Sequence, residues 1–191
     1  MRIFVALNLP GSLVEALAES AQALRERYPD ARWTPEDHLH ITLAFLGDIE
    51  EPGVTLLREA ADRAVQGRTP FALHTGKLFT LPRGKPAKVL AVSIEEGRTA
   101  IAALAEAVEN RLAEADYPFR PAEKRAFVPH ITLARRRNLP LKLLPEDRDR
   151  SLRAEGIAEG LTVFKSDLYR GGPVYTPLSS RRFASEGVYG S

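Results

Sequence analysis

The sequence predicts an α+β protein with two pseudo-symmetric lobes, antiparallel sheets, helices on the outside and a central groove. Three observations lead to this prediction. The pentapeptide His-Ile-Thr-Leu-Ala of residues 40–44 recurs at residues 130–134. Segments with apolar residues at helical spacing alternate with shorter segments rich in strand-forming residues. Many of those shorter segments are joined by short turns, which favours antiparallel pairing over a doubly wound parallel sheet.

The first half of the chain is expected to place two helices among its strands. Residues 2–9 alternate apolar side chains and predict a strand. Residues 12–27 predict a helix, with Ser12 as its N-cap. The other elements expected in this half are a strand over 40–46, a helix over 52–65, and strands over 71–80 and 87–94.

The second half contains the clearest helix, residues 99–115, in which apolar residues recur on one face. Residues 127–134 predict the second repeat strand, and residues 161–169 and 174–183 predict a closing pair of strands. The polar segment 138–158 leaves a short helix and a mobile loop as alternatives. No linker interrupts the pattern, so we expect one bilobal domain over 1–191.

The composition is that of an ordinary soluble globular protein, with 44% hydrophobic and 27% charged residues. The chain has no cysteine, which excludes disulfides, thiol nucleophiles and thiolate metal sites. No stretch approaches the length of a membrane helix, and the first ten residues lack the cleavage pattern of a signal peptide. We therefore expect a cytoplasmic protein, and a monomer because no coiled-coil pattern is present.

Basic residues gather in short groups, although the net charge is only +2. The groups fall within residues 83–88, 124–125, 135–137 and 181–182. Basic groups near a site favour a polyanionic ligand. The alternative for each single group is a solvated surface.

The repeated motif places its polar residues on one face of each strand. Successive side chains of a strand alternate, so His40 and Thr42 point the same way while the apolar residues between them point to the core. The same holds for His130 and Thr132. A single His-x-Thr is a weak signal and is often structural, but an identical five-residue repeat is much harder to attribute to chance. Two such strands facing each other would direct both imidazoles at one point.

Two opposed histidines are sufficient for acid–base cleavage of a phosphodiester. Imidazole titrates near neutrality, so one ring can accept a proton from the attacking group while the other donates one to the leaving oxygen. The two threonine hydroxyls can donate hydrogen bonds to the non-bridging phosphate oxygens. We expect no metal and no cofactor, since each acid–base group alone typically contributes about 10²–10⁴-fold to the rate.

A metal site is the alternative that His38 raises, because His38 and His40 are spaced as two ligands on a strand. A third ligand would have to come from His74 or from an acid such as Asp37. The favoured interpretation makes His38 a loop residue or a partner of the site, and His74 structural.

These residues carry a resemblance to a known family. The chain resembles the 2H phosphoesterase superfamily, most closely its bacterial and archaeal RNA 2′,3′-cyclic phosphodiesterase branch, historically called 2′-5′ RNA ligase. The matching segments, spread over nearly the whole chain, are residues 4–6, 40–47, 129–135 and 164–175.

The resemblance implies roles for the motif residues. His40 would be the proton donor, His130 the proton acceptor, and Thr42 and Thr132 would hold the phosphate. The reaction implied is hydrolysis of an RNA 2′,3′-cyclic phosphate end to a 2′-phosphate, with weak reversible 2′-5′ ligation of RNA in the family. Arg135 matches a basic residue at the end of the second motif.

The roles of two further residues and the choice among four functions stay open. Arg135 contacts phosphate or is a surface arginine at a strand end. Phe127 stacks on a base or is a buried core aromatic, which is the favoured interpretation. The substrate is an RNA end, a small cyclic nucleotide or a 2′-5′-linked oligonucleotide. An RNA-binding module without catalysis is the alternative from another class.

Overall fold

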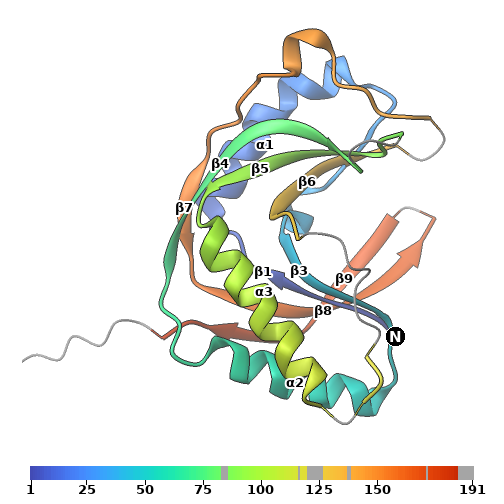
Figure 1. Cartoon of the computed structure of the whole chain (residues 1–191). Helices are drawn as coiled ribbons and strands as arrows, with labels where there is room; N and C mark the ends of the chain where they lie inside the picture. Colours follow the sequence, from blue (N-terminus) through green and yellow to red (C-terminus); the bar gives the residue numbers. More distant parts are fainter. Residues whose placement is uncertain (83–85, 116, 120–126, 137–138, 171, 185–191) are drawn as a thin grey trace, which may run out of the picture.

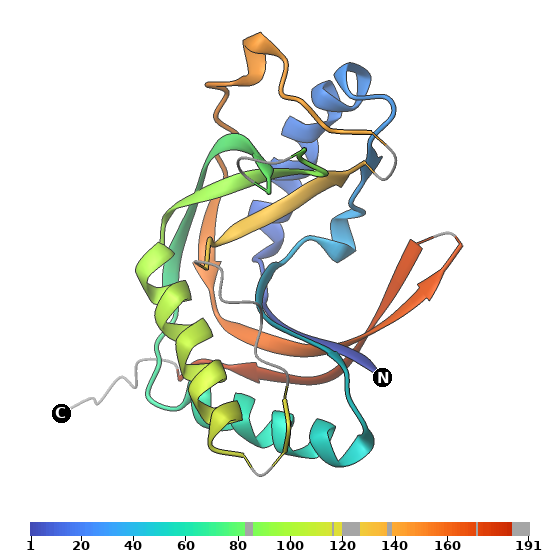
Figure 2. The same ribbon diagram turned by 45° about the vertical axis from the view of Figure 1, so that its right-hand side comes forward.

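Two antiparallel sheets face each other in the computed structural model, which describes residues 1–82, 86–115, 117–119, 127–136, 139–170 and 172–184. Sheet A has the order β3 (Ile41–Asp48), β1 (Arg2–Leu7), β8 (Gly160–Tyr169), β9 (Gly172–Arg182). Sheet B has the order β2 (Arg32–Trp33), β6 (His130–Arg135), β5 (Val89–Glu96), β4 (Phe71–Leu81), β7 (Glu155–Ala158). The predicted α+β class is confirmed, and each repeat motif contributes a strand to a different sheet (Figures 1 and 2).

The helices are exchanged between the two halves of the chain. Helix α1 (Gly11–Arg27) follows β1 of sheet A but contacts β7 of sheet B. Helix α3 (Arg98–Ala113) follows β5 of sheet B but packs with α2 (Glu51–Val65) and β3 beside sheet A (Figure 1). Each sheet therefore packs against a helix from the other half of the chain.

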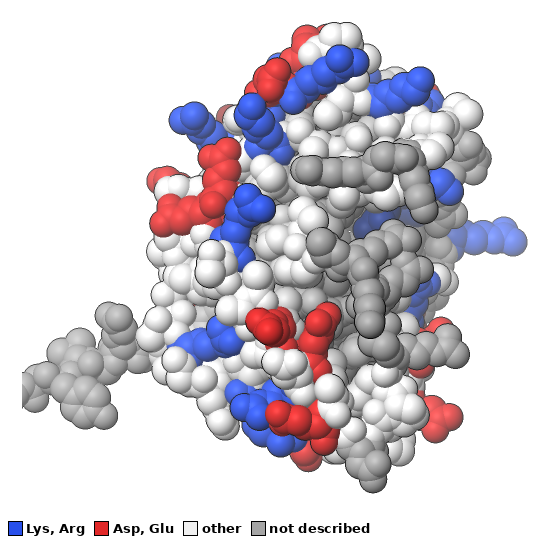
Figure 3. Space-filling view, viewed as in Figure 1, with Lys and Arg blue, Asp and Glu red and all other residues white. Residues whose placement is uncertain are grey.

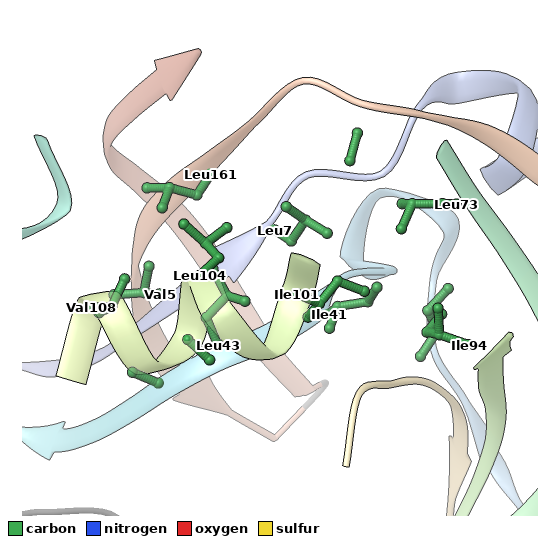
Figure 4. Close-up of a cluster of buried hydrophobic side chains, with 14 of the residues drawn as sticks. Val5, Leu7, Ile41, Leu43, Leu73, Ile94, Ile101, Leu104, Val108 and Leu161 are labelled. Carbon is green, nitrogen blue, oxygen red and sulfur yellow. The ribbon is translucent and has the colours of Figure 1, made fainter. Parts of the chain in front are cut away.

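The apolar residues of the motifs anchor both strands in the core. Ile41 and Ile131 are fully buried, and the leucines two positions later are each 2% exposed. Figure 4 shows Ile41 and Leu43 beside Ile101 of α3. Burying one such side chain stabilises the fold by about 1.5–3 kcal/mol. This burial fixes the register of each strand, since a slip by one residue would turn the apolar pair out and the histidine in.

The predicted helical faces are confirmed, but the N-cap predicted for the first helix is wrong. The predicted apolar face of α3 is buried, and its buried residues are Ile101, Leu104, Ala105, Val108 and Leu112. Helix α1 begins at Gly11 after Pro10, and no side chain caps it. The Pro10 carbonyl accepts the Leu13 and Val14 N–H groups, so the helix starts before Ser12, which lies inside its first turn.

The segment 138–158 is neither of its two predicted alternatives alone. Its described part, from residue 139, holds the short 3₁₀ helix η2 (Pro145–Asp147) and the edge strand β7. Asp147 is fully buried, with ion pairs to Arg27 and Arg150 and a hydrogen bond from Tyr28 Oη at 2.8 Å. The Leu144 N–H donates to the same phenol oxygen. This network fixes the segment against the end of α1.

The strand that carries the second motif, and its pairing, differ from the sequence prediction. The second repeat strand begins at His130 and not at Phe127, because Pro129 lacks an N–H for the ladder and the Val128 carbonyl accepts a histidine side chain. The two-residue strand β2 was not predicted, and it pairs with the end of β6. Among the described residues, no helix is both long and apolar enough to cross a membrane.

Candidate active site

The imidazole of His40 is held from both sides at the start of β3. Its Nδ1 lies 2.8 Å from the His38 carbonyl oxygen, and its Nε2 lies 3.0 Å from Thr42 Oγ1. A carbonyl oxygen only accepts, so Nδ1 carries a hydrogen and donates it. In the neutral ring Nε2 is then unprotonated and accepts a hydrogen bond from the Thr42 hydroxyl. The motif thus fixes both the tautomer and the direction of the reactive nitrogen.

The imidazole of His130 is held through Nδ1 in the same way at the start of β6. Its Nδ1 lies 2.7 Å from the carbonyl oxygen of Val128, again the residue two positions earlier. The neutral ring therefore also leaves Nε2 as its basic nitrogen. The sequence repeat is in this respect a repeat of hydrogen bonding.

The two histidines share one electrostatic environment. Burial lowers the pKa of His40 from 6.5 to about 4; the hydrogen bond to His38 opposes this, while the charges of Arg135, His38 and His130 add to it. Burial also lowers the pKa of His130, opposed by its hydrogen bond to Val128 and aided by Arg135. Strands β3 and β6 contact each other, so the two motifs come together across the sheets, as the repeat predicts.

Arg135 is the basic residue common to the site. It is exposed at the end of β6, and its positive charge lowers the pKa of His40, His130 and Tyr175. The phosphate contact of Arg135 stays a prediction, beside the alternative of a surface arginine at a strand end.

Tyr175 is the site residue that sequence reasoning missed. Its ring lies edge-on to His40 at 5.6 Å between centroids and against His38 at 4.4 Å. Burial raises the pKa of the Tyr175 phenol, so it stays protonated near neutrality and can donate a hydrogen bond. The only available signal was its place in the 164–175 segment of the family resemblance.

Each catalytic candidate also has a phenylalanine neighbour from another strand of its own sheet. The ring centroid of Phe4 in β1 lies 5.0 Å from that of His40, and the ring centroid of Phe79 in β4 lies 6.2 Å from that of His130. Phe127, predicted to be buried in the core or to stack on a base, is 40% exposed. The buried alternative is wrong, because Phe127 precedes β6 and does not belong to its ladder.

The histidines proposed for the metal alternative have different partners. His38 packs on Tyr175, whereas His74 Nδ1 lies 2.9 Å from Glu96 Oε2 on β5, with Glu155 of β7 on its other side. In the part of the chain that the structure describes, no three His, Asp or Glu side chains are grouped to hold a metal ion.

Several predicted basic groups are compensated by acids. Arg136 pairs with Asp30 at 2.7 Å, and Arg181 pairs with Asp62. Residues 83–85 and 124–125 lie outside the described part of the chain. On the face shown in Figure 3, basic and acidic side chains are intermixed. The coloured side chains on this face therefore form no patch of a single sign.

The comparisons with known proteins agree with this geometry. The model of the 2′-5′ RNA ligase superfamily matches residues 13–168. The RNA 2′,3′-cyclic phosphodiesterase of Thermotoga maritima is 28% identical over 185 residues, covering 96% of each chain. The protein of the same name from Thermus thermophilus is 32% identical over 194 residues, covering 100% of this chain and 93% of the relative.

Solved structures show the same fold. The crystal structure of TT0787 of Thermus thermophilus has a TM-score of 0.84 and 28% identity, covering 98% of this chain and 100% of the other. Escherichia coli LigT complexed with 3′-AMP has a TM-score of 0.75 and 23% identity, covering 95% and 97%. With a family match over most of its length and both repeat motifs in one site, the chain belongs to the 2′-5′ RNA ligase superfamily, the 2H phosphoesterases.

Proposed function

We propose that the chain hydrolyses the 2′,3′-cyclic phosphate at an RNA end to a 2′-phosphate, through proton transfers by His40 and His130. The observation that carries the proposal is the matched pair of imidazoles, each fixed through Nδ1 with Nε2 left for substrate, under the common charge of Arg135. Family membership and relatives named RNA 2′,3′-cyclic phosphodiesterase make the chain a hydrolase of this class.

The proposed reaction is an in-line displacement at phosphorus. The neutral Nε2 of His130 takes a proton from water, whose oxygen attacks the phosphorus while the bond to O3′ breaks. His40 gives its Nε2 proton to O3′, so the phosphate stays on O2′. Thr42 and Thr132 donate to the non-bridging oxygens as charge develops on them. The scheme uses no metal ion and no cofactor, because the two imidazoles supply both proton transfers.

The hydrogen bond between Thr42 and His40 gives the donor a simple way to prepare for reaction. In the free protein the Thr42 hydroxyl faces the unprotonated Nε2. Once Nε2 carries a proton it no longer accepts, so the hydroxyl turns its hydrogen to another acceptor. A bound phosphate oxygen is such an acceptor. Protonation of His40 and phosphate binding by Thr42 are thereby coupled in this proposal.

The low pKa of His40 is compatible with its role as the proton donor. With a pKa of about 4, only ~10⁻³ of the rings carry the proton at neutral pH in the free protein. The negative charge of a bound cyclic phosphate favours the protonated form and raises this fraction. Substrate binding thereby supplies the protonated donor that the free protein holds in only a small fraction of molecules. The choice of His40 as donor and His130 as acceptor rests on the family resemblance.

The same residues account for 2′-5′ ligation as a second reaction. If a ribose 5′-hydroxyl replaces water as the nucleophile, His130 takes its proton and His40 again protonates O3′. The product is then a 2′-5′ phosphodiester. Water at its high concentration competes with this nucleophile, so we expect ligation to be the minor outcome.

Product identification tests the proposal. A short RNA ending in a 2′,3′-cyclic phosphate is incubated with wild type, His130→Ala and the control His74→Ala, all in EDTA. We expect a 2′-phosphate from wild type and His74→Ala, and at least ~10²-fold slower turnover by His130→Ala. RNA retained without product would instead identify a binding module. A 3′-phosphate product would overturn the assignment of O3′ as the leaving group.

A further inference from the structure

An aromatic row crosses sheet A on the face that carries the site. Phe45 of β3 and Phe164 of β8 are both directly opposite Phe4 of β1 in their ladders. Directly opposed residues of antiparallel strands project from the same face. The centroid of the Phe4 ring lies 5.0 Å from that of the His40 ring and 5.3 Å from that of the Phe164 ring. The row therefore begins under the catalytic candidate and runs to both sides of it.

Phe45 is the open end of this row. Phe4 is 3% exposed, whereas Phe45 is 44% exposed. A phenylalanine in the middle of a strand, on the same face as the site and with nearly half of its surface in water, leaves apolar ring area uncovered. This exposed ring face is open to a stacking partner.

Arg2 links Phe45 to the catalytic residues. Its guanidinium carbon lies 5.1 Å from the centre of the Phe45 ring, within the range of a cation–π contact. Arg2 also lies two positions before Phe4 on β1, hence on the same face. Its charge lowers the pKa of Tyr175, the residue edge-on to His40. The guanidinium therefore lies close to both the open ring and the site.

We propose that Phe45 and Arg2 form a stacking subsite for one unpaired nucleobase, that of the nucleotide preceding the terminal cyclic phosphate. This inference rests on the proposed function. A chain that ends in a 2′,3′-cyclic phosphate continues only on its 5′ side, so a subsite beside the site receives the preceding nucleotide. Aromatic rings and guanidinium planes stack on any base, and the guanidinium can contact the connecting phosphodiester.

The subsite distinguishes two of the three substrate classes that the sequence left open, RNA ends and small cyclic nucleotides. A mononucleotide cyclic phosphate fills the catalytic site but leaves Phe45 in water. A dinucleotide covers Phe45 as well, and base–aromatic stacking is worth roughly five- to hundredfold per base. The enzyme should therefore prefer RNA ends over small cyclic nucleotides, with little dependence on which base precedes the end.

The test compares kcat/KM for a mononucleotide 2′,3′-cyclic phosphate with that for a dinucleotide ending in the same nucleotide. Wild type should favour the dinucleotide by about tenfold or more. Phe45→Ala should reduce this ratio to near one, and Phe45→Tyr should retain it. Phe45→Leu keeps apolar volume and removes the aromatic face, so it should also lose the ratio if folding is preserved. Tyr169→Ala is the matched control, since Tyr169 is 62% exposed near the end of β8.

Each outcome supports or overturns the subsite. Loss of the ratio in Phe45→Ala and Phe45→Leu, with the ratio kept in Tyr169→Ala, supports it. If wild type has equal kcat/KM for the two substrates, the subsite is refuted while the proposed function stands. The same holds if Phe45→Leu lowers kcat/KM for both substrates by the same factor. If Tyr169→Ala lowers the ratio as much as Phe45→Ala does, the effect is not specific to Phe45 and the subsite is refuted. Wild type that hydrolyses neither substrate refutes the proposed function and the subsite together.

Discussion

Replacing His40 by Gln should remove a pH-dependent component of the free energy of unfolding. The folded pKa of His40 is about 4, while the unfolded chain has the ordinary value of about 6.5. The unfolded state therefore binds a proton first as the pH falls. The stability that His40 contributes by staying neutral is fully present above about pH 6.5 and is lost progressively as the pH falls towards about 4.

The size of the effect follows from the same two pKa values. Linkage between them gives a loss of about 2 kcal/mol between neutral pH and pH 5. The ring is only partly buried, and solvent screening reduces the expected loss to about 1–2 kcal/mol. Glutamine has no titrating group, so the variant should lack this component while retaining those of all other residues.

Urea denaturation of wild type and His40→Gln at about pH 7.5 and about pH 5 measures the difference. We expect the stability of wild type to fall by about 1–2 kcal/mol more than that of the variant. NMR titration of the His40 ring gives the folded pKa independently. Equal losses in the two proteins, together with a ring that titrates near its ordinary value, would refute the reasoning about burial.

Substitutions at three other residues extend these tests. Arg135→Gln removes a charge that adds to burial in lowering the pKa of His40 and His130, so the limbs of the pH profile of kcat/KM should move to higher pH. Arg135→Lys should keep them in place. Tyr175→Phe preserves the ring contact with His40 and should lower kcat by less than about tenfold. Tyr175→Ala removes that contact and should lower kcat further. Steady-state kinetics of the two variants measures both effects. Asp147→Ala leaves the charge of Arg27 without its buried partner. The free energy of unfolding, measured by urea denaturation, should fall by about 3 kcal/mol. A fall of less than about 0.5 kcal/mol would contradict a stabilising role for the buried network.

The repeat motifs were predictable because strand periodicity alone decides which residues share a face. Ile41 had to turn to the core if His40 was to face the groove, and the same rule applied ninety residues later. The helical face of α3 followed from its spacing in the same way. These are local patterns, and the structure confirms them.

The features that were missed depend on contacts between distant segments. The four residues of β7 form a strand because the edge of β4 offers them backbone hydrogen-bonding partners. No local sequence pattern predicts this pairing. Asp147 lies in a polar segment, and only its contacts with the end of α1 bury it. Tyr175 reaches His40 because β9 pairs with β8, which pairs with β1. The sequence contains these residues, but its local patterns do not reveal the strand pairing that brings them together.

The most direct test of the two-histidine account is a double-mutant cycle of His40→Ala and His130→Ala, measured as kcat on an RNA 2′,3′-cyclic phosphate end. Two groups that transfer protons in one displacement act as a unit, so each single variant should be slowed by at least ~10²-fold and the double variant should be little slower than either. A double variant slowed by the product of the two single effects would show that the histidines act independently and would contradict a shared acid–base site.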